Sequence, residues 1–145
     1  MNKRLPDKWI RKAVHTAINN MVVDGNTIPC YDTRTPTKNT QSKFYVIMST
    51  QTNSVLKLNK CEDFWESSIL LDIITSYKGV SNPGSRLLAD NILDSVISLT
   101  DNLVLDVASG LSIIFQTENG INDISSITGT ENIFRKLIRI ELTIK

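Results

Sequence analysis

The chain has 145 residues, of which 41% are hydrophobic and 21% charged, and its sixteen Lys and Arg against fifteen Asp and Glu leave a formal net charge of +1. We expect one domain spanning 1–145, and the hydrophobic content with near-zero net charge excludes a wholly disordered chain. The small charge also argues against a protein that holds nucleic acid by neutralising phosphates. Apolar runs are too short for a membrane span, and the basic N-terminus lacks the apolar block of a secretory signal, so a soluble intracellular protein is expected.

The first expected element is a helix with Asp7 as its capping residue and Gly25 or Asn26 at its end. His15, the only histidine of the chain, lies near the edge of its apolar stripe. We interpret it as a partly buried helix residue rather than a general base, because no acidic or nucleophilic partner is placed beside it. The stripe recurs at steps of three and four and consists of Trp9, Ile10, Ala13, Val14, Ala17, Ile18 and Met21.

Two strands and an arm are expected next. A short strand at about Ile28–Thr33 contains Pro29, which predicts a sheet edge or a strand start. An exposed arm is predicted at about 33–43, because 34–43 carries no large apolar side chain. β-branched and aromatic residues predict a strand at Phe44–Thr52.

The third expected strand is the longest, with alternate residues from Trp65 to Tyr77 on one face and polar residues on the other. Leu70 and Ile74 interrupt the polar set, which predicts that part of the second face is covered. After a flexible connection at 79–84, Ser85 is expected to cap a second helix. The apolar stripe predicted for that helix is Leu88, Ile92, Val96, Leu99 and Leu103.

Strands return after Asp106, first at 111–118, followed by a turn at Asn119-Gly120. The polar segment 121–127 has no clear assignment. The last strand alternates, with Phe134, Ile138, Ile140, Leu142 and Ile144 facing inward. The order α-β-β-β-α-β-β predicts an α+β domain, with two helices packed on one face of a mainly antiparallel sheet.

Side chains suited to catalysis are sparse. No Walker-type or dinucleotide-binding glycine pattern occurs, and Ser85 with Arg86 is a simple helix cap more readily than an anion site. Cys30 and Cys61 stand far apart with no C-x-x-C, which fits neither zinc nor a redox pair; a disulfide between them is the minor alternative. We therefore expect no catalytic residue, no cofactor and no metal, and a protein that is not an enzyme.

The succession of elements resembles the bacteriophage tail-terminator and tail-completion family, small neck proteins that stack as rings between portal and tail. The resemblance covers about Leu5 to Lys145. Tyr31–Arg34 and Ser67–Thr75 look most like versions from phages of Bacteroidetes hosts, including the crAss-like group, whereas a long connection at 53–63 departs from the typical pattern. The segments that carry the resemblance are the first helix, Pro29-Cys30-Tyr31-Asp32-Thr33-Arg34, Phe44–Thr52, Trp65–Thr75, the second helix and Phe134–Leu142.

This resemblance implies a non-enzymatic virion component of the phage neck. It would form a homo-oligomeric ring of six or twelve copies, contact portal or adaptor and tail proteins, and let DNA pass without sequence-specific binding or membrane contact. The alternative function is a small non-enzymatic α+β binding or regulatory domain.

A ring needs heterologous contacts, for which the arm and the two sheet edges are candidates. For each residue of the expected interface, an ordinary solvated side chain is the alternative. The expected oligomer-interface residues are Tyr31, Asp32, Arg34, Lys38 and Lys43.

Overall fold

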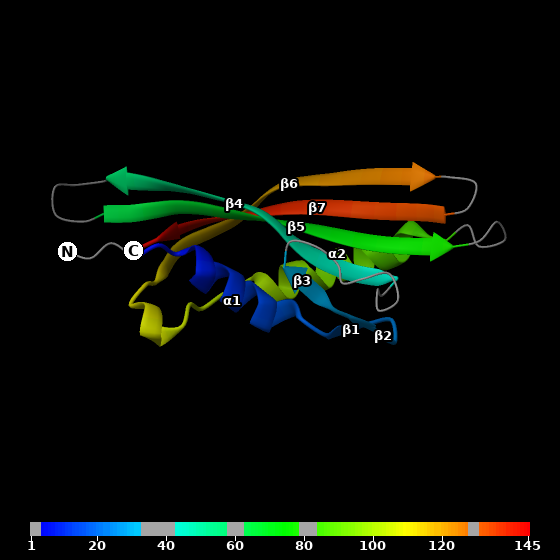
Figure 1. The fold of residues 1–145 in the computed structure, drawn as a ribbon, viewed down its shortest axis with the longest axis horizontal. Helices are drawn as coiled ribbons and strands as arrows, with labels where there is room; N and C mark the ends of the chain where they lie inside the picture. Colours follow the sequence, from blue (N-terminus) through cyan, green and yellow to red (C-terminus); the bar gives the residue numbers. More distant parts are fainter. Residues whose placement is uncertain (1–3, 33–42, 58–62, 79–83, 128–130) are drawn as a thin grey trace.

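The computed structural model describes residues 4–32, 43–57, 63–78, 84–127 and 131–145. A five-stranded sheet forms one layer, and two helices cover one of its faces (Figure 1). The long strands pair antiparallel with their neighbours, and only the short edge strand β3 pairs in parallel, with β4. The predicted α+β class, with helices on one face of a mainly antiparallel sheet, is confirmed. Across the sheet the order is β3 (Cys30–Asp32), β4 (Phe44–Lys57), β5 (Asp63–Lys78), β7 (Glu131–Ile144) and β6 (Ile113–Ile127).

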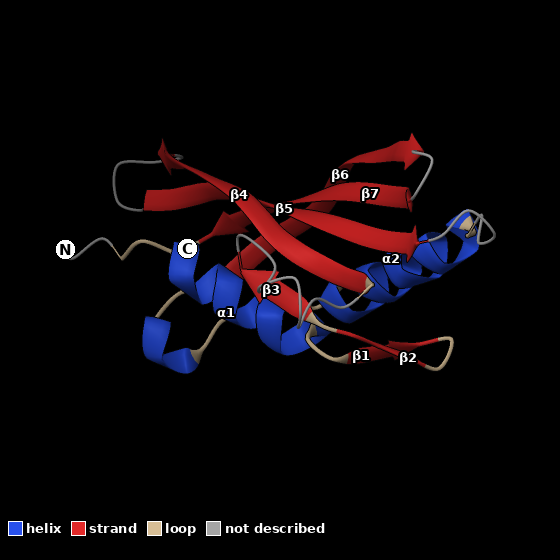
Figure 2. Ribbon diagram, turned by 45° about the vertical axis from the view of Figure 1, so that its right-hand side comes forward, coloured by secondary structure: helices blue, strands red, loops and turns tan. Residues whose placement is uncertain are grey.

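Helix α1 (Asp7–Ile18) is shorter than predicted. Asn19 is extended and Asn20 has a left-handed φ of 59°, so the chain leaves the helix there and not at Gly25. It then forms a two-stranded ribbon that the sequence analysis missed, β1 (Met21–Val23) antiparallel to β2 (Asn26–Ile28) (Figure 2). The prediction that Met21 belongs to the helix was wrong, because a single apolar residue three positions after Ile18 fits the buried face of a strand equally well.

The predicted cap of α1 is also wrong. Pro6 occupies the capping position, where its fixed φ is compatible with the helix, and no side chain caps the end. Asp7 is the first helical residue, and its carboxylate accepts a hydrogen bond from Nδ2 of Asn53 on β4. Its backbone carbonyl accepts another from Nε2 of Gln51 at 3.1 Å. Asp7 therefore ties the start of α1 to the sheet.

Helix α2 (Arg86–Thr100) begins as predicted, because Oγ of Ser85 accepts a hydrogen bond from the Leu87 amide at 3.0 Å. Its buried stripe is rotated from the predicted one. Leu99 is 45% exposed and Leu103 lies beyond the helix, whereas Thr100 is buried and donates its hydroxyl to the Val96 carbonyl. The stripe consists of Ala89, Ile92, Leu93, Val96 and Thr100. A short 3-10 turn, η1 (Val107–Ser109), follows.

Two strands are longer than predicted. β4 continues through Asn53 to Lys57, so the expected long connection at 53–63 is wrong. β6 runs through Asn119 and Gly120, which form a bulge with a left-handed φ of 70° at the glycine and not a hairpin turn. Both halves of β6 pair with β7, and this long-range pairing makes the polar segment 121–127 a strand.

The core lies between the helices and the sheet. The predicted inner face of β5 is buried, with Ile69, Leu71 and Ile73 fully inaccessible, and the predicted alternation of β7 is confirmed at Ile138 and Ile140. The prediction that part of the outer face of β5 is covered is also borne out, since Ile74 is 8% exposed between its register partners on β4 and β7. Neither described helix is long and apolar enough to cross a membrane.

Candidate functional site

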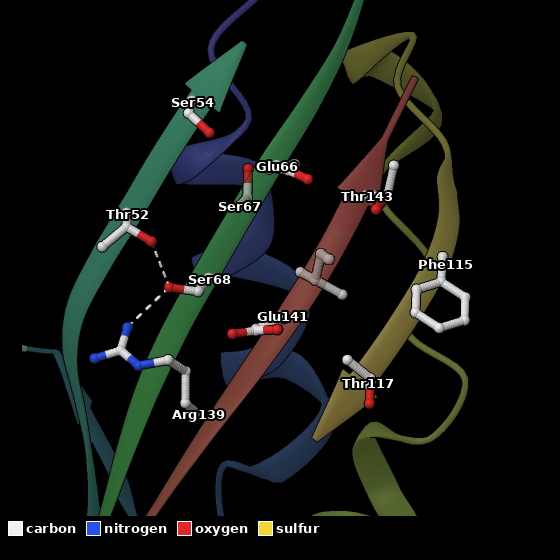
Figure 3. A pocket seen from close by; sticks show the side chains of 11 residues that line it. Thr52, Ser54, Glu66, Ser67, Ser68, Phe115, Thr117, Arg139, Glu141 and Thr143 are labelled. Atoms are coloured by element: carbon white, nitrogen blue, oxygen red, sulfur yellow. Dashed lines mark hydrogen bonds between the residues drawn. The ribbon is translucent and has the colours of Figure 1, made fainter. Parts of the chain in front are cut away.

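The sheet face turned away from the helices carries a shallow polar groove of about 420 Å³ (Figure 3). Its floor spans four strands, and most of the side chains that line it alternate away from the core. Ser67 does not, because it is 4% exposed and donates its hydroxyl to Asn53, which binds Asp7 at the start of α1. The labelled groups are Thr52 and Ser54 of β4, Glu66, Ser67 and Ser68 of β5, Arg139, Glu141 and Thr143 of β7, and Phe115 and Thr117 of β6.

Hydrogen bonds join the strands across this groove. Nη1 of Arg139 donates to Oγ of Ser68 at 2.8 Å, and the Ser68 and Thr52 hydroxyls lie 2.5 Å apart. Nδ2 of Asn119 donates to Oε1 of Glu141 at 3.0 Å. The lining contains carboxylates, hydroxyls and one guanidinium, with no histidine or cysteine. Such a surface is suited to hydrogen bonding with a partner.

A half-buried ion pair lies on the same face, with a largely buried Asp72 carboxylate and an Arg135 side chain that is 38% exposed. Nη2 of Arg135 is 2.5 Å from Oδ2 of Asp72, and Nε of Arg135 donates to Oδ1 at 3.3 Å. Asp72 is 8% exposed, and its hydrogen bond raises the pKa of the Arg135 guanidinium, which therefore stays charged. The two-point contact fixes β5 against β7 and covers part of the outer face.

Both edges of the sheet are open among the described strands. β6 pairs with β7 alone, and its exposed large apolar side chains are Ile114, Phe115, Ile121, Ile124 and Ile127. At the opposite edge, β3 covers β4 only at 46–48, which leaves 51–57 with one partner strand. Long edge strands with exposed apolar side chains are sites where another strand adds.

The expected interface residues fall in separate places. The ring of Tyr31 lies 5.8 Å from that of Tyr45, and Oδ2 of Asp32 lies 3.8 Å from Nη1 of Arg11 on α1. Lys43 is exposed just before β4, five positions from Met48, the register partner of Asp32, so it lies roughly 16 Å from the end of β3. Arg34 and Lys38 lie outside the described residues, as does the arm from 33 to 42. The structure thus brings Tyr31 and Asp32 together at one edge and leaves Lys43 apart.

The residues interpreted above as structural have the following surroundings where they are described. His15 is half-buried on α1. Ser85 uses its hydroxyl as a cap, and Nη1 of Arg86 lies 3.9 Å from Oδ2 of Asp123. Cys30 is a free, buried thiol, and burial together with the nearby Asp32 charge raises its pKa to about 12; Cys61 lies outside the described part of the chain.

The groove was not predicted as a site. The alternation expected for the third and last strands puts Glu66, Ser68, Arg139 and Glu141 on outward faces, as the structure has them. The sequence alone does not bring these faces together, because that requires the pairing of β5 with β7 across about 70 residues of chain. The available signal was the same polar alternation in two separate strands.

These elements define an α+β fold in which one helical layer covers a sheet with two open edges. No protein-family model matches the sequence, and no curated protein sequence matches it. A solved structure with the same fold is a chain in the virion of a native gene transfer agent particle, with a TM-score of 0.66. The match covers 97% of this chain and 99% of that chain at 13% sequence identity, so the likeness is one of fold.

Proposed function

We propose that this chain is a structural component of a phage-like virion, and that it forms a homo-oligomeric ring in the neck between head and tail. The observation that carries the proposal is the fold shared with a chain of a gene transfer agent virion over nearly all of both chains. A match of that extent covers the whole fold and not only a common packing motif. The resemblance of the sequence to tail-terminator proteins is the reason for proposing the neck as its position in the particle.

The surfaces of the subunit support assembly with other copies. A closed ring needs two different patches that meet each other, and among the described strands this sheet has two open edges of different character. β6 offers exposed apolar side chains, whereas β4 offers an open segment at 51–57. The hydrogen-bonding groove lies between these edges and supplies a further contact surface for portal, adaptor or tail proteins.

Passage of DNA through the ring is compatible with the charges of the subunit. DNA must move along such a channel, so the wall should not neutralise many phosphates. The formal charge of the whole chain is only +1, so the subunit as a whole neutralises few phosphates. We infer that DNA passes without sequence-specific contacts.

The test is to locate the chain in purified particles. Antibody labelling combined with cryo-electron microscopy is expected to show one ring at the junction of capsid vertex and tail. Particles that lack the chain, or that carry it elsewhere, would contradict the proposal and favour a small binding or regulatory domain.

A further inference from the structure

We propose that copies of this chain join head to tail through a two-layer contact, which rests on the ring of the proposed function. In this contact, the β6 edge and the acidic flank of α2 in one subunit meet the β4 edge and the basic flank of α1 in the next. The acidic flank is defined as Asp90, Asp94 and Asp101, and the basic flank as Lys8 and Arg11.

Each sheet edge has its own helix. α1 contacts β3, β4 and β5, whereas α2 contacts β5, β7 and β1, so within the sheet α1 lies toward the β4 edge and α2 toward the β6 edge. A neighbour that extends the sheet at β6 would therefore bring its α1 next to α2 of the first subunit.

The acidic flank of α2 faces the β6 side. Asp90, Asp94 and Asp101 are four and seven residues apart, which places them on one flank of the helix. Oδ1 of Asp90 lies 2.9 Å from Nζ of Lys136 on β7, and that ammonium also holds Asp123 of β6 at 3.0 Å, which fixes the direction of the flank. Asp94 and Asp101 are exposed and form no ion pair with any described residue.

Asp101 also lies at an unfavourable place within its own subunit. It is the residue that closes α2, where a negative charge opposes the helix dipole, and the last turn contains no basic residue to compensate it. A positive group from outside the subunit would relieve this charge.

The basic flank of α1 shows the complementary pattern. Lys8 and Arg11 lie three residues apart, and the contact of Arg11 with Asp32 on β3 directs this flank toward the β3–β4 edge. Lys8 is exposed in the first turn, where a positive charge opposes the dipole. Its ammonium lies 4.7 Å from the centre of the Trp9 ring and makes no ion pair within the described residues.

The register of the sheet places the start of α1 and the end of α2 at the same position along the strands. Asn53 of β4 pairs with Ser67, which pairs with Leu142, which pairs with Gln116 of β6. Asn53 binds the carboxylate of Asp7 at the start of α1, and Nε2 of Gln116 donates to the Thr100 carbonyl at the end of α2. One row of residues across the sheet thus fixes the start of α1 at one edge and the end of α2 at the other.

Strand direction permits the same contact. Three successive antiparallel pairings make β6 run opposite to β4. A neighbour rotated about an axis along the strands would therefore present its open β4 segment antiparallel to β6, as in the rest of the sheet. At that level β6 exposes Ile114 and Phe115, beside the row that ends at Gln116.

Charge reversal tests this contact. The variant Asp94→Lys/Asp101→Lys and the variant Lys8→Glu/Arg11→Glu are each expected to weaken self-association at least about tenfold, measured by mass photometry and sedimentation. Their equimolar mixture should recover it, because each reversed flank then meets the other. Lys12→Glu is the matched control, since Lys12 bonds to Asp106 within its own subunit. Equal association of all variants, or no recovery in the mixture, would overturn the contact.

A cross-link tests it where the wild-type chain stays monomeric in dilute solution. Lys8→Cys and Asp101→Cys chains, both with Cys61→Ser, are mixed at high concentration and oxidised, with Lys12→Cys replacing Lys8→Cys as control. We expect about tenfold more disulfide-linked dimer than in the control. The yield of dimer should fall at high salt, because salt screens the charges of the two flanks. No enrichment overturns the contact. Particles with a labelled neck ring but no cross-link refute this contact alone, whereas particles without the chain refute the proposed function whatever the cross-link shows.

Discussion

The buried thiol of Cys30 makes the free energy of unfolding depend on pH. Its thiol would ionise near pKa 9.0 in the unfolded chain but has a pKa of about 12 on β3, chiefly because burial disfavours the thiolate. Below about pH 9 both states hold the proton and the contribution to stability is constant; above it only the unfolded state releases the proton, so the free energy of unfolding falls as pH rises toward 12.

We therefore expect Cys30→Ala to lose part of this alkaline decline. Urea unfolding at about pH 8 and about pH 10.5 measures it, and any cavity left by the alanine lowers both values alike. Cys61→Ser serves as the control. A decline that is the same in Cys30→Ala and in the wild type would show that the thiol is not protected.

The pair of Asp72 and Arg135 predicts a non-additive response to mutation. Arg135→Met leaves the buried Asp72 carboxylate without its main partner and is expected to cost about 1–3 kcal/mol. Asp72→Leu/Arg135→Met should recover much of that loss, because the desolvated charge is then absent. Chemical unfolding of both single variants and the double variant gives the coupling; a harmless Arg135→Met would contradict the half-buried pair.

Ile138 tests the register of β7. Ile138→Asp places an unpaired charge in the fully buried helix-facing layer and is expected to unfold the chain, as seen by circular dichroism. Ile138→Val should cost only about 0.5–1.5 kcal/mol. Ile127→Asp, at a side chain that is 73% exposed, should retain the fold. Native stability of Ile138→Asp would mean that the strand is shifted by one residue.

Among the elements, α2 depends on a single cap. Ser85→Ala removes the acceptor for the Leu87 amide and is expected to cost about 0.5–2 kcal/mol of the free energy of unfolding. Ser98→Ala, on an exposed position of the same helix, should change stability little, because alanine favours helix. Equal effects of the two substitutions would exclude the cap as the cause.

Elements determined by short-range patterns could be predicted from the sequence. The cap at Ser85 needs two neighbouring residues, and the alternation of β7 needs only its own strand. The end of α1 and the second half of β6 could not be predicted, because each depends on partners elsewhere. Met21 becomes a strand residue by pairing with Ile28, and the polar segment 121–127 is a strand only because β7 lies beside it.

At the scale of the whole molecule, deletion of the polar segment 35–42 tests whether folding and assembly depend on different parts of the chain. It lies outside the described residues, and its lack of large apolar side chains predicts that it contributes no core. Deletion of 35–42 is expected to preserve the thermal unfolding midpoint within a few degrees and to reduce ring formation in particle assembly. A variant that fails to fold would show that the segment belongs to the core.

The candidate site could not be predicted from exposure alone. Exposure suggested Tyr31, Asp32, Arg34, Lys38 and Lys43; of these, the sequence neighbours Tyr31 and Asp32 lie on the edge strand β3, and their part in an interface stays a prediction. The groove needed the strand order, because it combines residues as distant as Thr52 and Thr143 on neighbouring strands. The charged flanks needed it too, because the same pairing fixes the start of α1 and the end of α2 at opposite edges of the sheet. Outward charges on a single helix look like ordinary solvation until the opposite edge of the subunit is known.

The difference between the β6 edge and the β4 edge has a consequence for how the proposed assembly grows. A subunit whose two ends fit each other always accepts one more copy, so addition stops only when the last end reaches the first. In the proposed ring the angle between neighbours decides whether that happens, and we expect the twist of the sheet and the bulges at Met48/Gln51 and Asn119/Asn122 to contribute to that angle. A substitution that straightens either bulge is then expected to turn the closed ring into an open helical filament.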